Sequence, residues 1–364
     1  MTAGTGRQAY LDRVRGFAVL VMIEAHVLDA WTRQSDRHST AYRYAIVLGG
    51  FGAPLFLFLA GVTFVLSAES KYRKTGDAGT SWRAVQKRGW QIFALAFLFR
   101  LQSFILTGGY NLIGLLNVDI LNVMGPAIVF MGFVGSRLKT RFGRALVLAV
   151  LTASVAMLTP IVRATPLLNW LPDPIEWYFR ASPARSNFTL FPWAAFVFAG
   201  AVVGEVIDGL RSADRTFRVQ MALAAASILV IVASYEASLL PSIYPASDFW
   251  TTSPTFFFLR VGLIALLLPL VFLWDRSPWR GAISRWSPIE ELGQASLFVY
   301  WIHVEMVYGF IGRPLRQNLS FPAAIVADAL FSAFILALVL LKNRFVTMRK
   351  EGSLSTAGPT PASI

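Results

Sequence analysis

The stretch YLDRVRGFAVLVMIEAHVLDAW, residues 10–31, decides the fold, because its apolar run is long enough to cross a bilayer. A helix needs about 20 residues to span ~30 Å of hydrocarbon. Arg7, Arg13 and Arg15 precede this run, as basic residues do in a secretory signal. The run continues through Trp31 without a small-residue cleavage site, so we expect a first spanning helix that is retained.

Apolar stretches of spanning length recur along the 364-residue chain, which is 55% hydrophobic and 15% charged with a mean hydropathy of +0.57. Soluble domains are nearer a quarter charged. We place the stretches near 14–31, 45–68, 88–107, 115–135, 144–163, 188–207, 217–235, 255–274, 293–311 and 322–342. The sequence therefore predicts an all-α, polytopic membrane helical bundle of about ten transmembrane helices. A transmembrane β-barrel would show shorter, ~10-residue alternating segments instead.

The predicted bundle makes up one transmembrane domain, residues 10–346. We expect a disordered N-terminus over 1–9 and a disordered cytoplasmic tail over 347–364, because the end of the chain is polar and rich in small residues. The sequence shows no internal repeat, no P-loop and no dinucleotide-binding fingerprint.

Positive charge alternates between successive loops. Loops 108–114 and 236–254, on one side of a ten-span bundle, contain neither Lys nor Arg, and loops 32–44, 164–187 and 312–321 on that side hold a few arginines. The segments 69–87, 136–144, 208–216, 275–292 and the tail all fall on the other side and carry more positive charge as a set. Positively charged loops remain in the cytoplasm. This pattern places both termini there and accounts for the net charge of +13 without a nucleic-acid partner.

The reactive side chains are few. The chain has no cysteine, which excludes disulfides, thiolate catalysis and Cys-ligated metals. We expect no metal cofactor. Imidazole is supplied by three residues alone: His26, His38 and His303.

Charged and polar side chains inside the predicted spans need a reason, because a charge at the bilayer centre costs about 2.5–3.5 kcal/mol on insertion scales. These residues are Arg15, Glu24, His26, Asp29, Arg100, Asn117, Asp119, Asn122, Arg260, His303 and Glu305. Hydrogen bonds between packed helices account for some polar residues of membrane bundles. Arg100 and Arg260 can serve simply as ion-pair partners.

Three polar residues of the first span share a helix face. Arg15 and His26 are eleven residues apart, which is close to three turns and about 16 Å along the axis. Asp29 follows His26 at i+3 and lies beside it. The pattern favours a functional role for His26.

Three residues on different predicted spans lie at similar depths in the membrane. His26, Arg100 and His303 each lie ten to twelve residues from the predicted cytoplasmic end of their span, which corresponds to about 15–18 Å. Asp119 enters from the opposite side to a similar level. We therefore predict that two imidazoles, a guanidinium and carboxylates converge in one buried pocket.

The predicted outer loops are aromatic rather than charged. Their rings can form an interfacial aromatic belt or a platform on which a sugar ring stacks. The aromatic residues are Trp170, Trp177, Tyr178, Tyr244, Phe249 and Trp250.

Residues 10–31 resemble the first helix of the transmembrane acyltransferase superfamily, which includes the acyltransferase-3 proteins, the bacterial DUF1624 proteins and heparan-α-glucosaminide N-acetyltransferase. The acyltransferase-3 pattern is Arg, ten residues, then His, and Arg15 and His26 have that spacing. GAPLFLFLAGVTFVLS (52–67) and LGQASLFVYWIHVEMVYG (292–309) resemble further helices of these proteins. Together with VDILNVMG and FPWAAFVFAG, the resemblance covers roughly residues 8–345.

The resemblance also leaves an alternative for the imidazole. In the eukaryotic acetyltransferase an Asn aligns with His26 and the functional His lies further on, where His38 is the nearest match with a different loop spacing. We favour His26 as the catalytic imidazole. The sugar specificity of the eukaryotic enzyme does not carry over.

The resemblance implies transfer of an acyl group from acyl-CoA, with acetyl-CoA the expected donor, to an acceptor across the membrane. The imidazole of His26 or His303 would accept the acceptor's proton or carry the acyl group, oriented by Asp29 or Glu305. Arg100 would stabilise the oxyanion. The phosphates of CoA would meet Arg15, Lys87 and Arg88 at cytoplasmic helix ends, although these residues also fit the ordinary positive-inside bias.

The expected acceptor is a hydroxyl or amine of an extracytoplasmic sugar or glycan, and the expected partners are membrane lipids and that glycan, with homodimer formation open. Similarity to bacterial members implies a bacterial cytoplasmic (inner) membrane. Buried charges also mark transport pathways. A secondary transporter or flippase for a sugar or lipid-linked substrate is therefore the alternative function.

Overall fold

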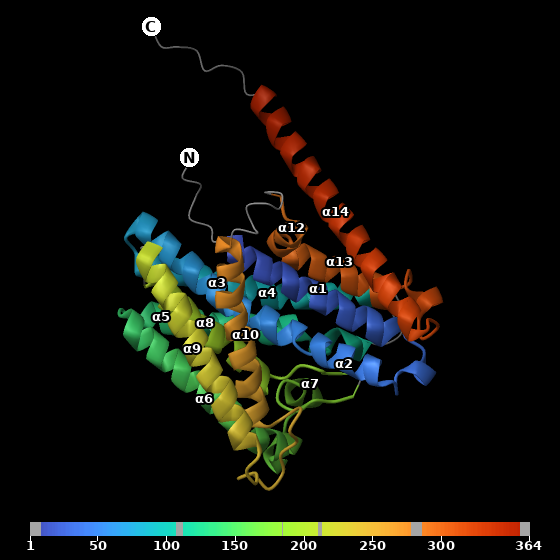
Figure 1. Cartoon of the computed structure of the whole chain (residues 1–364), viewed down its shortest axis with the longest axis horizontal. Helices are drawn as coiled ribbons and strands as arrows, with labels where there is room; N and C mark the ends of the chain where they lie inside the picture. Colours follow the sequence, from blue (N-terminus) through green and yellow to red (C-terminus); the bar gives the residue numbers. More distant parts are fainter. Residues whose placement is uncertain (1–8, 107–111, 184, 210–212, 278–285, 357–364) are drawn as a thin grey trace. The chain divides into compact units, whose positions relative to one another are not determined.

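The computed structural model describes residues 9–106, 112–183, 185–209, 213–277 and 286–356, and its regular structure is helical (Figure 1). Among these residues β-pairing is confined to isolated bridges, so the predicted all-α fold is confirmed. The α-helices are α1 (Ala9–Trp31), α2 (Thr40–Gly49), α3 (Gly52–Thr75), α4 (Ala78–Leu106), α5 (Ile120–Arg137), α6 (Arg141–Ala164), α7 (Asp173–Glu176), α8 (Leu190–Asp208), α9 (Ala213–Ser238), α10 (Pro254–Arg276), α12 (Pro288–Gln294), α13 (Ser296–Tyr308) and α14 (Phe321–Thr356).

Short 3₁₀ helices complete the connections: η1 (Gln34–Asp36), η2 (Leu112–Leu116), η3 (Pro166–Trp170) and η4 (Arg313–Leu315). The tail predicted from residue 347 begins within α14, which continues to Thr356. Residues 357–364 of that tail, residues 1–8 of the predicted N-terminus, and parts of the basic loops at 210–212 and 278–285 lie outside the described residues.

Eight helical runs in the described part of the chain are long and apolar enough to cross a membrane. They coincide with eight of the ten predicted stretches, which shows a multi-pass membrane protein. The first and ninth stretches form α1 and α13 but do not meet the same criteria. Within its last 18 residues α1 carries Arg15, Glu24 and Asp29, and α13 has only 13 residues. A count of ten spans therefore stays a prediction, as does the cytoplasmic position of both termini.

The predicted domain comprises two compact units. The first unit, residues 1–49 and 284–364, unites the two ends of the chain, and the second unit is residues 50–283. In the first unit α1 packs against α2, α12, α13 and α14. Its core is formed by aliphatic residues of these helices, including Val19, Ile23, Val299 and Val339.

Backbone hydrogen bonds join the two chain segments of the first unit. The Leu319 N–H donates to the Trp31 carbonyl at 3.0 Å, and the Arg33 N–H donates to the Leu319 carbonyl at 2.9 Å. Asp36 accepts the N–H of Phe321 at the start of α14. A hydrogen bond from Arg33 is the main cause that holds the pKa of Asp36 below its usual value.

The backbones of α1 and α12 are in direct contact at two glycines. A Cβ on Gly16 would lie 1.8 Å from the Ile289 carbonyl oxygen, and one on Gly293 would lie 1.8 Å from the Asp12 carbonyl oxygen. Small residues permit such close helix approach in membrane bundles. This contact fixes where α13 begins relative to α1.

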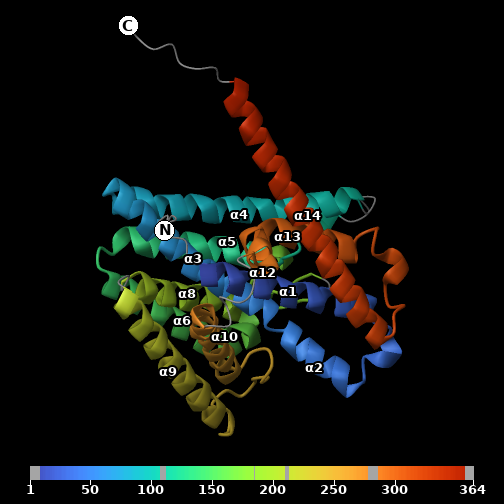
Figure 2. The same cartoon turned by 45° about the horizontal axis from the view of Figure 1, so that its top comes forward.

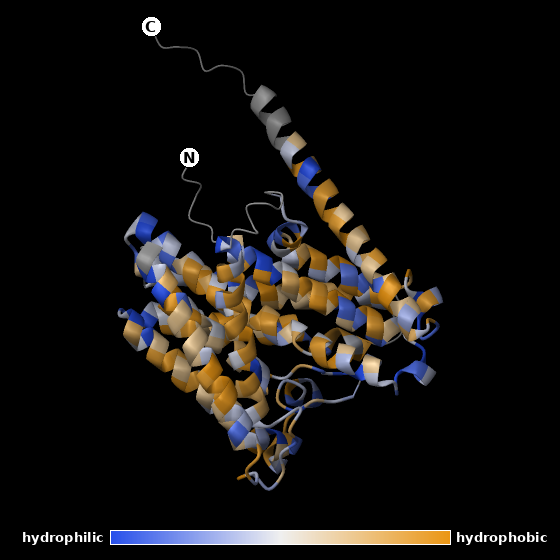
Figure 3. Cartoon of the chain, in the orientation of Figure 1, coloured by the Kyte–Doolittle hydropathy of each residue, from blue (hydrophilic) through white to orange (hydrophobic). Residues whose placement is uncertain are grey.

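The second unit consists of paired helices. α3 packs along α8, α4 along α5, α6 along α8, and α9 along α10 (Figures 1 and 2). The long helices are hydrophobic along most of their length, with hydrophilic residues near their ends (Figure 3). Between α6 and α8, the helical structure of the described residues is η3 and the one-turn α7, and no spanning run lies among them.

Candidate functional site

Two imidazoles meet in the first unit. His26 on α1 and His303 on α13 lie with Nδ1 of His26 2.9 Å from Nε2 of His303, and the rings stack with centroids 5.1 Å apart. His303 is fully buried and His26 is partly buried. The two histidines that the sequence placed at equal depth are therefore in direct contact.

The backbone sets the tautomer of this pair. Nδ1 of His303 lies 2.7 Å from the carbonyl oxygen of Val299, one turn earlier in α13. A carbonyl only accepts, so Nδ1 of His303 carries the hydrogen and Nε2, in the neutral ring, carries a lone pair. Nδ1 of His26 must then donate to that lone pair. The hydrogen-bond network thus assigns an unprotonated Nε2 to His26, which is the state a general base requires.

Arg15 and His26 do share a face of α1, because both contact α13. Arg15 donates to the Ser296 hydroxyl at 2.7 Å, and Ser296 is seven residues, or about two turns, before His303. Arg15 also pairs with Asp12 at 3.4 Å. Its guanidinium therefore joins α1 to α13, a contact that the predicted role in binding CoA phosphates did not include.

Asp29 contacts a residue that the sequence did not single out. Its carboxylate accepts a hydrogen bond from the Tyr308 hydroxyl at 2.9 Å and faces Arg37 at 3.7 Å. The side chain is 56% exposed. The Tyr308 ring meets His26 edge-on, with centroids 5.5 Å apart. Asp29 thus reaches the imidazole through Tyr308, and the Val299 carbonyl orients the pair directly.

No local pattern marks Tyr308 as part of this cluster. It is five residues after His303, which is off the face of α13 that carries the imidazole. The one sequence feature that bears on Tyr308 is the carboxylate of Asp29, which can accept a hydrogen bond at the end of its helix. The sequence does not tell which residue donates that hydrogen bond.

The other two acid–base candidates lie away from the imidazole pair. Glu305 is half-buried and follows His303 by two positions on α13, so the two side chains point to different sides of the helix. His38 is exposed in the turn between η1 and α2. His303, rather than His38, is the imidazole that contacts His26.

The second unit holds a separate polar cluster. Arg100 on α4 pairs with Asp119 at 3.3 Å, as its alternative role of ion-pair partner requires, and its predicted role at the oxyanion stays a prediction. Asp119 and Asn122 form a capping box at the start of α5, and the Asn122 amide donates to the Tyr178 hydroxyl at 3.3 Å. Burial raises the pKa of Tyr178. Convergence of Arg100 and Asp119 with the imidazoles stays a prediction.

Lys87 and Arg88 are exposed on α4, where Arg88 donates to Gln91 at 3.2 Å. Both cations are accessible to an anionic ligand. Their predicted contact with CoA phosphates also stays a prediction.

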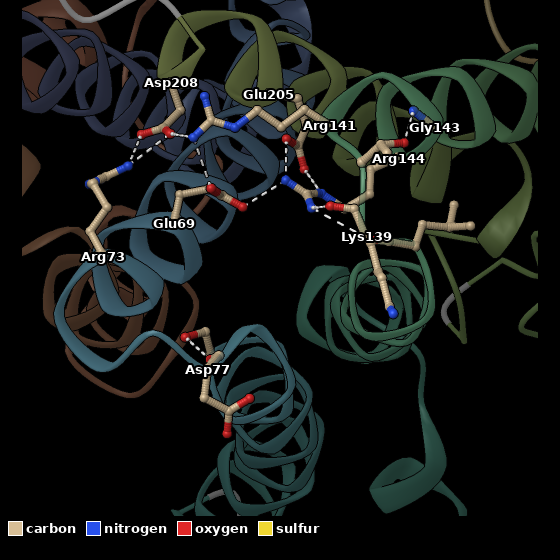
Figure 4. Close-up of polar contacts among 12 residues, drawn as sticks. Glu69, Arg73, Asp77, Lys139, Arg141, Gly143, Arg144, Glu205 and Asp208 are labelled. Atoms are coloured by element: carbon tan, nitrogen blue, oxygen red, sulfur yellow. Dashed lines mark hydrogen bonds and ion pairs between the residues drawn. The ribbon is translucent and has the colours of Figure 1, made fainter.

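Three of the arginines assigned to basic loops are bound by buried carboxylates (Figure 4). Arg144 on α6 contacts Glu205 of α8 at 2.5 Å and Glu69 of α3 at 2.7 Å. Asp208 accepts from Arg141 at 2.8 Å and from Arg73 at 2.9 Å, and Arg141 also reaches Glu69. Three acids and three arginines thus join α3, α6 and α8. We call these six residues the ion network.

A cavity of about 510 Å³ lies at the adjoining ends of α6, α9 and α10. Tyr244 and Phe249, two of the predicted platform residues, contribute to its lining together with Met157 and Phe258. The Tyr244 hydroxyl donates to the Met157 carbonyl at 2.8 Å, which holds the loop against α6. The lining contains serine and threonine hydroxyls but no charged group. The aromatic loop therefore encloses an uncharged concave surface.

Residues 7–244 match a family model described as heparan-alpha-glucosaminide N-acetyltransferase, catalytic. The match covers well over half of the chain and includes α1 with His26. His303 and Tyr308 lie beyond it. A search of curated proteins found no match. Within the described residues, no three His, Cys, Asp or Glu side chains are grouped as metal ligands would be.

Proposed function

The chain belongs to the heparan-α-glucosaminide N-acetyltransferase catalytic family of membrane acetyltransferases, and we propose that it transfers an acetyl or other acyl group from cytoplasmic acyl-CoA to a hydroxyl or amine of an extracytoplasmic sugar or glycan. The observation that carries this proposal is the hydrogen-bond chain from His26 through His303 to the Val299 carbonyl. It supplies a partly buried base whose tautomer is set by a neutral ring and a backbone carbonyl.

In the proposed reaction Nε2 of His26 takes the proton from the acceptor hydroxyl or amine as that group attacks the thioester carbon. The carbon–sulfur bond breaks, the acyl group remains on the acceptor, and the CoA thiolate leaves and takes up the proton that His26 received. A covalent variant, in which Nε2 first carries the acyl group, uses the same lone pair. Acyl-CoA is a substrate in both routes.

His303 acts on this step through His26. When Nε2 of His26 is protonated, its Nδ1–H still donates to His303, and the hydrogen bond to a charged ring is stronger than one between neutral rings. The Tyr308 ring edge limits rotation of His26. We assign His26 as the catalytic residue and His303 and Tyr308 as positioning residues.

The proposal is tested by measuring CoA release from acetyl-CoA by the purified chain against a panel of amino sugars and glycans. Because the chain has no cysteine, a thiol-reactive dye reports released CoA without a signal from the protein. We expect release that depends on an acceptor. Replacing His26 with Ala should lower it by about 10²- to 10⁴-fold, the usual contribution of a general base.

His38→Ala is the matched control, because it removes an imidazole that is exposed in a turn. We expect that variant to keep the wild-type rate. Loss of activity in His38→Ala with full activity in His26→Ala would assign catalysis to the other imidazole. Substrate counterflow in proteoliposomes without any dependence on CoA would favour the transporter function.

A further inference from the structure

Arg260 is a buried cation surrounded by aromatic rings. It lies on α10 in the second unit, six residues after Pro254, which is about 9 Å along the helix. Its guanidinium carbon is 4.3 Å from the Phe256 ring centroid, 5.3 Å from that of Phe196 and 5.8 Å from that of Trp193. Only 8% of the residue is exposed.

Within the described part of the chain, Arg260 has no carboxylate and no hydrogen-bond acceptor within bonding distance, and its Nε atom is buried without a partner. Other arginines of the second unit differ in this respect. Arg100 pairs with Asp119, and Arg144 pairs with Glu205 and Glu69. Aromatic faces attract a cation, but they leave the N–H donors of a guanidinium unsatisfied. A buried arginine of this kind lacks the oxyanion that its planar fork is shaped to bind.

The rings around Arg260 continue toward the aromatic loop before α10. The Phe256 ring contacts the rings of Phe249 and Trp250, each with centroids 5.0 Å apart. On the other side Trp193 stacks edge-on against Phe188 at 4.7 Å. The charge bias of the sequence places this loop on the side opposite the cytoplasm, where an acceptor would arrive.

We propose that Arg260 and the rings of Trp193, Phe196 and Phe256 form an oxyanion-binding subsite for an acceptor that carries a carboxylate or phosphate group. This inference rests on the proposed acyl transfer, and it narrows the acceptor to an acidic saccharide or a lipid-linked sugar phosphate. The guanidinium binds the oxyanion through two parallel N–H donors. The rings of Trp193 and Phe256, which are partly exposed, pack against the apolar face of the sugar ring, whereas the buried Phe196 supports the guanidinium from within.

The test measures retention of labelled glucuronate, inorganic phosphate and glucose by the full chain in phosphatidylcholine nanodiscs, without any acyl donor. We expect saturable retention of an oxyanion and none of glucose. Arg260→Gln should weaken oxyanion binding at least tenfold. Arg260→Lys keeps the charge but loses the planar pair of donors, so its affinity should lie between those of the wild type and Arg260→Gln. Labelled phosphatidylglycerol forms a second arm, and its Arg260-dependent retention in place of glucuronate would identify a lipid-linked phosphate as the source.

Arg276→Gln is the matched control. Arg276 lies on the same helix and over a Phe ring at 4.5 Å, but it is exposed. We expect this variant to bind like the wild type. Unfolding temperatures measured for every variant separate loss of the site from loss of the fold. The proposal is overturned if no oxyanion is retained above the level of glucose, or if Arg260→Gln retains it as well as the wild type.

The oxyanion-binding subsite and the proposed acyl transfer can each fail without the other. Arg260-dependent binding with no CoA release for any acceptor would leave the subsite intact and remove the acyl transfer. CoA release onto a neutral amino sugar at equal rates in wild type and Arg260→Gln, without oxyanion binding, would retain the acyl transfer and remove the subsite.

Discussion

The Nε2 atom of His26 holds its lone pair because His303 accepts the hydrogen on Nδ1. His303 can accept because its own Nδ1–H donates to the Val299 carbonyl. The proton arrangement of the site therefore depends on one backbone oxygen rather than on an acidic side chain. Asp29 and Glu305, which the sequence offered as orienting acids, do not perform that function directly.

This arrangement predicts the behaviour of His303 variants. His303→Leu removes the acceptor, so the tautomer of His26 is no longer fixed, and we expect kcat for CoA release to fall by about 10²-fold with KM little changed. His303→Gln supplies an amide oxygen as the acceptor and should recover part of the loss. Steady-state kinetics of both variants make the measurement.

Asp29→Asn is the control for these kinetics. Its carboxylate bonds to Tyr308 and faces Arg37, so the change alters a hydrogen bond worth about 0.5–1.5 kcal/mol and should lower kcat by less than about tenfold. A larger loss in Asp29→Asn than in His303→Leu would contradict the backbone assignment.

At the scale of helices, the ion network joins α3, α6 and α8 by charges rather than by apolar packing alone (Figure 4). Its carboxylates are almost completely buried. A buried charge is tolerated when it is paired, and removal of one partner leaves the other exposed to a low dielectric. Arg73, Arg141 and Arg144 are thus occupied by carboxylates, although the sequence alone attributes them to the positive-inside bias.

The network predicts a strong and specific loss of stability. Arg144→Met leaves Glu205 without its arginine, and we expect the free energy of unfolding to fall by about 3–5 kcal/mol. Adding Glu205→Met should recover much of that loss, because no buried charge is then left unpaired at this position. Denaturant unfolding of the single and double variants in detergent measures the coupling.

The exposed pair Arg83–Asp77, at 3.9 Å, provides the comparison. Arg83→Met should cost at most about 1 kcal/mol, because solvent screens exposed ion pairs. Equal losses in Arg83→Met and Arg144→Met would show that burial adds nothing to the network.

At the scale of the whole molecule, the number of membrane spans depends on α1 and α13, the two helices that carry the paired imidazoles. Eight helical runs of the described residues are long and apolar enough to cross a membrane. The helix α1 is not among them because it carries too many charged residues. Two of the three charges that exclude α1 are paired in the first unit: Arg15 with Asp12, and Asp29 with Tyr308 and Arg37. A helix that satisfies most of its charges within the protein can still cross a bilayer.

Cysteine labelling tests this crossing directly, because a chain without cysteine gives no background. If α1 crosses, single cysteines placed at Ala9 and Gln34 should react with a membrane-impermeant maleimide from opposite sides of sealed vesicles. Lys71→Cys should react from the same side as Ala9→Cys. Labelling of positions 9 and 34 from one side would reduce the count of spans and reposition the imidazole pair.

The sequence by itself determined the membrane class, the helical fold and the position of most spans, because a run of about 20 apolar residues has few other stable arrangements in lipid. It also determined that Arg15 and His26 share a face, because helical periodicity is local. Pairing between distant segments is not local. The contact of His26 with His303, the link of Asp29 to Tyr308, the ion network and the unpaired state of Arg260 depend on which helices adjoin and at what rotation. The tertiary structure alone decides these contacts, since many packings bury the same apolar faces equally well.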